Sequence, residues 1–98
     1  MKINFNKNND VLNVSLDGRL DTITAPEFES FIYENGVDIK AININCEKLA
    51  YISSAGLRVL LAAQKKMQKI GSMKLTGVCE EVMEVFDMTG FADILVIE

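Results

Sequence analysis

Apolar residues recur at every second position near the start of the chain, which is the period of a β-strand with one buried face. Two strands are marked in this way, by Ile3 and Phe5 in the first and by Leu12, Val14 and Leu16 in the second. The Lys7–Asp10 segment between them contains asparagine and aspartate, which favour turns. The pattern therefore predicts a β-hairpin.

The spacing then changes to that of an amphipathic helix, which we expect from about Ala25 to Tyr33. Thr24 followed three residues later by Glu27 matches a capping box at the start of this helix. Asn35-Gly36 is a stop signal after it. The side chains expected to be buried are Phe28, Phe31 and Ile32.

Strand and helix patterns alternate through the rest of the chain. They predict a strand over Ile39–Cys46, a helix over Ala55–Ile70 that ends at Gly71, a strand marked by Met73, Leu75 and Val78, a helix over Glu80–Met88, and a last short strand marked by Ile94, Val96 and Ile97. The predicted order is β-β-α-β-α-β-α-β. Such an order favours an α/β fold with right-handed crossovers, in which a mixed β-sheet is flanked by helices.

Length and charge narrow the possible functions. From the length of 98 residues we expect one domain, residues 1–98, and 49% of the residues are hydrophobic, which suffices for a single core. The formal net charge of −4 argues against nucleic-acid binding. The one basic cluster, Lys65, Lys66 and Lys69, lies at the end of a predicted helix, where cations suit the helix dipole. No signal-peptide core or membrane-length apolar run is present, so we expect a soluble cytoplasmic protein without a membrane partner.

The residue types disfavour an enzyme, a metal site or a cofactor site. The chain has no histidine, which is the commonest general acid or base and the commonest metal ligand. Cys46 and Cys79 lie far apart in the sequence, and we interpret them as unpaired thiols in a reducing compartment. No phosphate-binding loop, dinucleotide-binding motif or metal-ligand spacing occurs, so we expect no metal and no cofactor.

Two adjacent hydroxyls, Ser53 and Ser54, stand where a strand-like segment passes into the helix predicted from Ala55. A helix start carries unpaired backbone N–H groups and the positive end of the dipole. A serine there is a helix cap, a phosphorylation site, or both. A Ser-His-Asp triad, which would make the serine a hydrolytic nucleophile, is excluded because the chain has no histidine. A phosphoacceptor needs only exposure, since the kinase supplies nucleotide, metal and base.

Two further residues, Gly56 and Asp21, leave alternatives open. Gly56 either lets a partner backbone approach closely or permits tight packing in the first helical turn. Asp21 either satisfies N–H groups of its own loop or lies near Ser54 in a recognition surface. If the second and third strands are neighbours, both loops lie at one end of the sheet.

Three segments carry a resemblance to a known family: Gly18-Arg19-Leu20-Asp21-Thr22 with Ala25, Leu49-x-Tyr51-Ile52-Ser53-Ser54-Ala55-Gly56-Leu57, and Val85-Phe86-x-x-Thr89-Gly90-Phe91. Together they resemble the STAS family, and within it the bacterial anti-sigma factor antagonists, nearly from end to end. The resemblance implies a mixed sheet flanked by helices and a role that is not enzymatic.

The resemblance also implies a partner and a switch. The partner is an anti-sigma factor of the histidine-kinase-like ATPase type, which is a serine kinase. It phosphorylates a serine at the start of the second main helix, the phosphorylated antagonist lets go, and a phosphatase restores it. By position that serine corresponds to Ser54. Many family members have an aspartate directly before it, where this chain has Ser53.

These arguments predict a switchable binding module that holds the anti-sigma factor while unphosphorylated and so frees the sigma factor. The expected partner-binding residues are Asp21, Thr22, Ser53, Ser54, Ala55, Gly56 and Arg58. The alternative is a scaffold or transporter-associated interaction module of the same fold that is not phosphorylated.

Overall fold

The hairpin predicted at the start of the chain is present in the computed structural model, which describes residues 1–98. Strand β1 (Lys2–Asn8) pairs antiparallel with β2 (Val11–Leu20), so that Phe5 lies opposite Val14. Asn9 closes the turn with φ 56°, a left-handed conformation that asparagine tolerates better than most residues. The turn residues and the two-residue period are thus sufficient to set this part of the fold.

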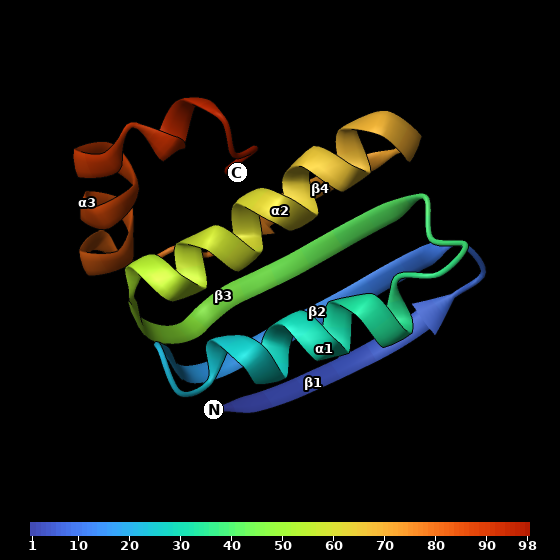
Figure 1. The fold of residues 1–98 in the computed structure, drawn as a ribbon, viewed down its shortest axis with the longest axis horizontal. Coiled ribbons are helices and arrows are strands. Elements are labelled where there is room, and N and C mark those ends of the chain that lie inside the picture. Colours follow the sequence, from blue (N-terminus) through green and yellow to red (C-terminus); the bar gives the residue numbers. More distant parts are fainter.

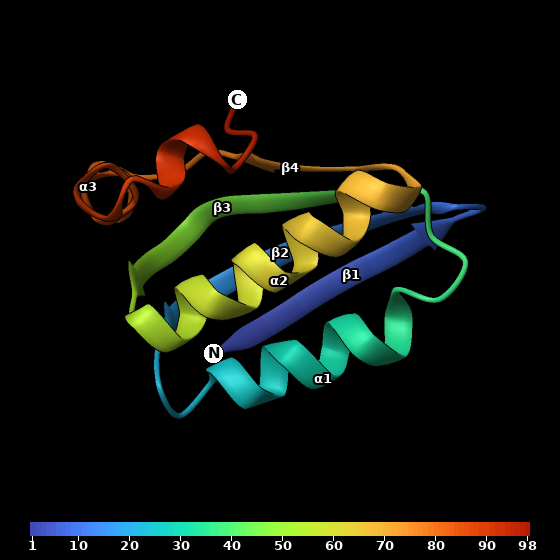
Figure 2. The ribbon, with the colours of Figure 1, turned by 45° about the horizontal axis from the view of Figure 1, so that its top comes forward.

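The four strands lie in the order β1-β2-β3-β4 (Figure 1). Strand β3 (Ala41–Ile52) is parallel to β2, and β4 (Ser72–Thr76) is parallel to β3. The connections are helices α1 (Ala25–Asn35) and α2 (Ser54–Ile70). Crossovers of one hand that advance in one direction place their helices on one face of the sheet. Figure 2 shows α1 and α2 side by side on the same face.

The core lies between that face and the two helices. Alternate residues of β2 and β3 are buried there, namely Leu12, Val14, Leu16, Ile42, Ile44 and Cys46. Phe28 and Ile32 of α1 are buried as predicted, but Phe31 is only partly covered because it packs over the edge strand, with its ring 4.9 Å from that of Phe5. Cys46 and Cys79 are free thiols, and burial raises the pKa of Cys46 to about 12.

The predicted final strand is wrong. After α3 (Glu80–Thr89), the Phe91–Asp93 segment forms a 3₁₀ turn, and the turn conformation continues through Ile94. Too few extended residues then remain before the end of the described chain to pair with β4 as a strand. What remains is one parallel bridge, Leu75 with Ile97. The order of regular elements is β-β-α-β-α-β-α, and the mixed sheet with flanking helices is otherwise as predicted.

One core residue is polar. Gln64 of α2 is only 2% exposed, and its Oε1 has no hydrogen-bond partner. An unpaired buried polar atom costs free energy, and methionine has a similar length without it. We expect Gln64→Met to raise the free energy of unfolding by about 1 kcal/mol, measured by urea denaturation. Gln68→Met, on the exposed surface of the same helix, is the control and should give no comparable gain. A loss of stability in Gln64→Met would show that the amide is satisfied in solution.

Candidate functional site

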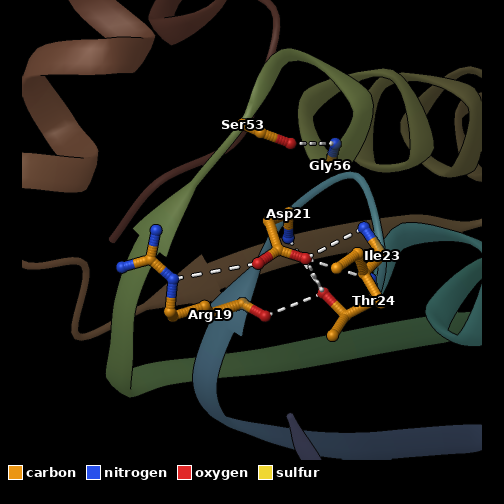
Figure 3. Close-up of polar contacts among 6 residues, drawn as sticks. All are labelled: Arg19, Asp21, Ile23, Thr24, Ser53 and Gly56. Atoms are coloured by element: carbon orange, nitrogen blue, oxygen red, sulfur yellow. Dashed lines mark hydrogen bonds and ion pairs between the residues drawn. The ribbon is translucent and has the colours of Figure 1, made fainter.

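The ends of β2 and β3 meet because the two strands are parallel. Leu20 lies beside Ile52, and the Ser53 N–H donates to the Leu20 carbonyl at 2.9 Å. The loop that carries Asp21 and the start of α2 therefore lie at the same end of the sheet (Figure 3). The expectation that both loops share one end, conditional on neighbouring strands, is confirmed.

The helix start separates the two serines by role. Ser53 has an extended backbone (φ −98°, ψ 173°), and its Oγ accepts from the Gly56 N–H at 3.3 Å. Ser53 is thus the N-cap, in the geometry that such caps use. Ser54 is the first residue of α2, and its side chain is exposed to solvent. The capping role predicted for one serine belongs to Ser53, which leaves the Ser54 hydroxyl accessible.

Asp21 organises its own loop. Its Oδ1 accepts from the backbone N–H groups of Ile23 at 3.0 Å and Thr24 at 3.1 Å (Figure 3). The N–H of Thr24 lowers the pKa of this carboxyl below its ordinary value, and the Ile23 N–H, the Thr24 hydroxyl and the Arg19 guanidinium lower it further, in that order. The carboxylate is therefore ionised near neutral pH. Of the two alternatives for Asp21, the loop contacts are present, and they fix the acid next to the start of α2.

Thr24 does not form the predicted capping box. Its side chain makes no capping bond to α1. Its hydroxyl instead accepts from the Asp21 N–H at 2.9 Å and donates to the Arg19 carbonyl at 2.8 Å. The Thr24 N–H, which the Glu27 side chain would accept from in a capping box, donates to the Asp21 carboxylate instead. The sequence match to Thr24 and Glu27 was real, but the strand end upstream offered better partners.

Gly56 is buried against the end of β2. A Cβ at this position would lie 2.7 Å from Leu20 Cγ and 2.8 Å from the Leu20 carbonyl oxygen. The structure therefore supports tight packing in the first turn, one of the two alternatives for this glycine. Gly56 itself is buried, and its part in partner binding stays a prediction.

The remaining predicted residues surround a shallow cavity of about 190 Å³ between the Asp21 loop and α2. Thr22, Ala55 and Arg58 line this cavity, together with Pro26 and Glu29 of α1. Thr22 and Arg58 are exposed, and Ala55 is half-buried. The structure thus brings all seven predicted partner-binding residues to one end of the molecule. Their contact with a partner stays a prediction.

Arg19 and Tyr51 belong to the same end and were not among the predicted site residues. They are neighbours across β2 and β3, and the Arg19 guanidinium lies 4.1 Å from the centre of the Tyr51 ring. Arg19 Nε also lies 3.8 Å from Asp21 Oδ2. Tyr51 is 40% exposed. The sequence held one signal, because Arg19 and Tyr51 each lie inside one of the segments that resemble the family. That the two side chains meet follows only from the parallel register of β2 and β3.

The polar side chains at this end supply hydroxyls, carboxylates, guanidinium groups and the phenol of Tyr51. No three histidine, cysteine or acidic residues are grouped so as to hold a metal ion. None of the helices is long and apolar enough to cross a membrane. The exposed nucleophile, Ser54, lies at a helix start without a histidine in the chain to act as its base. Such a serine is suited to receive a group from another protein.

Comparison with known proteins identifies the class. A family model described as "STAS domain" matches residues 2–98, so the chain belongs to the STAS domain family. The anti-sigma-B factor antagonist of Bacillus subtilis (strain 168) is 29% identical over 99 residues, a match that covers 97% of this chain and 88% of that protein. The protein of the same name from Listeria monocytogenes is 26% identical over 97 residues, and this match covers 94% of this chain and 82% of that protein.

Solved structures confirm the fold. An anti-sigma factor antagonist from Mycobacterium paratuberculosis superposes with a TM-score of 0.87 at 23% identity, over 98% of this chain and 83% of that chain. The Bacillus cell fate determinant SpoIIAA in its phosphorylated form gives 0.76 at 17% identity, over 99% and 91%. The mixed sheet with flanking helices, and the resemblance seen in the sequence motifs, are both confirmed.

Proposed function

We propose that this protein is a bacterial, cytoplasmic anti-sigma factor antagonist that regulates transcription through a phosphorylation switch at Ser54. In the unmodified form it binds an anti-sigma factor of the histidine-kinase-like ATPase type and so frees the sigma factor. The observation that carries the proposal is the exposed Ser54 hydroxyl at the first position of α2, beside the ordered Asp21 loop. The proteins named anti-sigma-B factor antagonist that match nearly the whole chain support it.

The switch consists of a single phosphoryl transfer. Ser54 Oγ attacks the γ-phosphorus of ATP held by the partner, the new O–P bond forms, and the bond to the ADP oxygen breaks. The hydroxyl proton passes to a base on the kinase. The product is a dianionic group at a helix start, where free N–H groups and the dipole favour negative charge.

The unequal roles of the two serines make the switch local. The Ser53 hydroxyl stays in the cap, so α2 keeps its first turn when Ser54 is modified. The added charge and bulk are then felt mainly by a partner docked over Ser54, Thr22 and Arg58. Release of the partner follows from repulsion and from loss of fit. A phosphatase that acts on phosphoserine returns the protein to its binding form.

Binding of the partner tests the proposal. The unmodified protein is immobilised and used to retrieve partners from its own cells, and the captured anti-sigma factor is then purified. We expect Ser54→Asp to weaken its affinity at least tenfold, or by about 1.4 kcal/mol, while the melting temperature stays nearly unchanged. The matched control is Ser30→Asp on the exposed surface of α1, which should leave affinity unaltered. Equal binding by Ser54→Asp would favour the scaffold without a phosphorylation switch.

A further inference from the structure

Arg58 is a cation without an ionic partner at the start of α2. The two ion pairs in the structure are Arg19 with Asp21 and Lys74 with Glu98. Arg58 is exposed and lies four residues after Ser54 on the same helix. Residues with this spacing are neighbours on a helix surface, and helical side chains lean toward the N-terminus. This spacing places Arg58 within reach of a group carried on Ser54, and Arg58 also lines the cavity that Thr22 and Glu29 share.

The other charges at this end are already engaged or are acidic. Arg19 lies against the Tyr51 ring and beside the Asp21 carboxylate. Asp21 from the loop after β2 and Glu29 of α1 are anions, and Glu29 shares the cavity with Arg58. A further negative group placed on Ser54 would thus meet like charges as well as the helix dipole. Arg58 is the cation on the same helix face that is free to offset it.

We infer that Arg58 is the intramolecular ligand of the phosphoryl group that Ser54 receives. The inference rests on the proposed modification at Ser54 and adds its structural consequence. An acidic group that precedes a basic one by four residues has the more favourable order for a helix pair, and a guanidinium binds phosphate oxygens in a forked geometry. Phosphorylation then changes the partner-binding surface of this protein in two ways: it adds an anion at Ser54, and it draws the Arg58 cation into a pair with that anion.

The test measures the second pKa of the phosphate in the protein itself. Phosphoserine is inserted at position 54 during translation, and the phosphorus NMR shift is followed from pH 4 to pH 8. An adjacent cation favours the dianion. We expect the phosphate pKa to be about 0.3 pH unit lower in the parent protein than in Arg58→Gln, with Arg58→Lys in between. The difference should shrink in 0.5 M salt, since the pair is exposed.

Arg19→Gln is the matched control, because it removes the other arginine at this end. It should shift the phosphate pKa by less than Arg58→Gln does. An unchanged phosphate pKa in Arg58→Gln, or an equal shift in Arg19→Gln, would overturn the pairing. Both arginines are exposed, and circular dichroism melting of each variant verifies that it folds. Because the phosphoserine is inserted without a kinase, this result is independent of whether a partner phosphorylates Ser54. That question is decided separately, by incubating the parent protein and Ser54→Ala with the captured anti-sigma factor and ATP and determining the modified residue.

Discussion

Replacement of Ser54 by alanine should abolish phosphoryl transfer to this protein. The neighbouring hydroxyl is no substitute, because Ser53 Oγ accepts from the Gly56 N–H and is half-buried in the cap. The captured anti-sigma factor, Mg²⁺ and ATP are incubated with each variant, and the intact mass and the modified residue are determined. The parent protein should gain one phosphoryl group at Ser54, and Ser54→Ala should gain none.

Ser53→Ala is the informative counterpart. It should still be phosphorylated at Ser54, but it should lose about 1 kcal/mol of stability because the Gly56 N–H loses its cap. Ser54→Ala should keep the melting temperature of the parent protein. Undiminished phosphorylation of Ser54→Ala would rule out Ser54 as the acceptor. If Ser54→Ala lost stability and Ser53→Ala did not, the capping role would belong to Ser54.

The sequence predicts the fold well where the pattern of burial is regular. Alternation identifies the hairpin and the buried side of β3 as far as Cys46. Beyond Cys46 the alternation is lost, and the predicted strand stops there, although β3 runs on to Ile52. The pairing of β2 with β3 shifts its register twice in this stretch, between Ser15 and Asp17 and between Gly18 and Arg19. Such irregularities bend strands and break the two-residue period, so periodicity cannot follow them.

The candidate site was predicted in its residues but not in its connections. Motif resemblance picked out Asp21 and Ser54, and both lie at the same end of the sheet. The division of labour between Ser53 and Ser54 required the backbone angles of the helix start, because either serine fits a cap by sequence. The stacking of Arg19 on Tyr51 required the parallel register, because Tyr51 follows Arg19 by 32 positions in the chain. Patterns of neighbouring residues predict local structure, whereas contacts between the ends of two strands depend on how the strands pair in the sheet.

An alanine at position 56 should destabilise the protein by about 1–3 kcal/mol, although alanine is the better helix former by about 1 kcal/mol. Its Cβ would lie 2.7 Å from Leu20 Cγ, 2.8 Å from the Leu20 carbonyl oxygen and 3.1 Å from Ile52 Cγ1. The Leu20 side chain is fully buried, and one of the crowded atoms is a backbone oxygen, which cannot turn away as a side-chain atom can. Steric overlap should therefore outweigh helix propensity.

The same substitution should weaken partner binding, because the crowded oxygen is the acceptor of the Ser53 N–H. Relief of the overlap requires α2 to move away from Leu20, which displaces Ser54 from the Asp21 loop. Urea denaturation measures stability, and titration with the purified anti-sigma factor measures affinity. Ala62→Gly, at an exposed position of α2, is the control: it should lose about 1 kcal/mol through helix propensity and keep its affinity. A gain of stability in Gly56→Ala would mean that the first turn of α2 has room for a side chain, and that the close packing of this helix on β2 does not hold the serine in place.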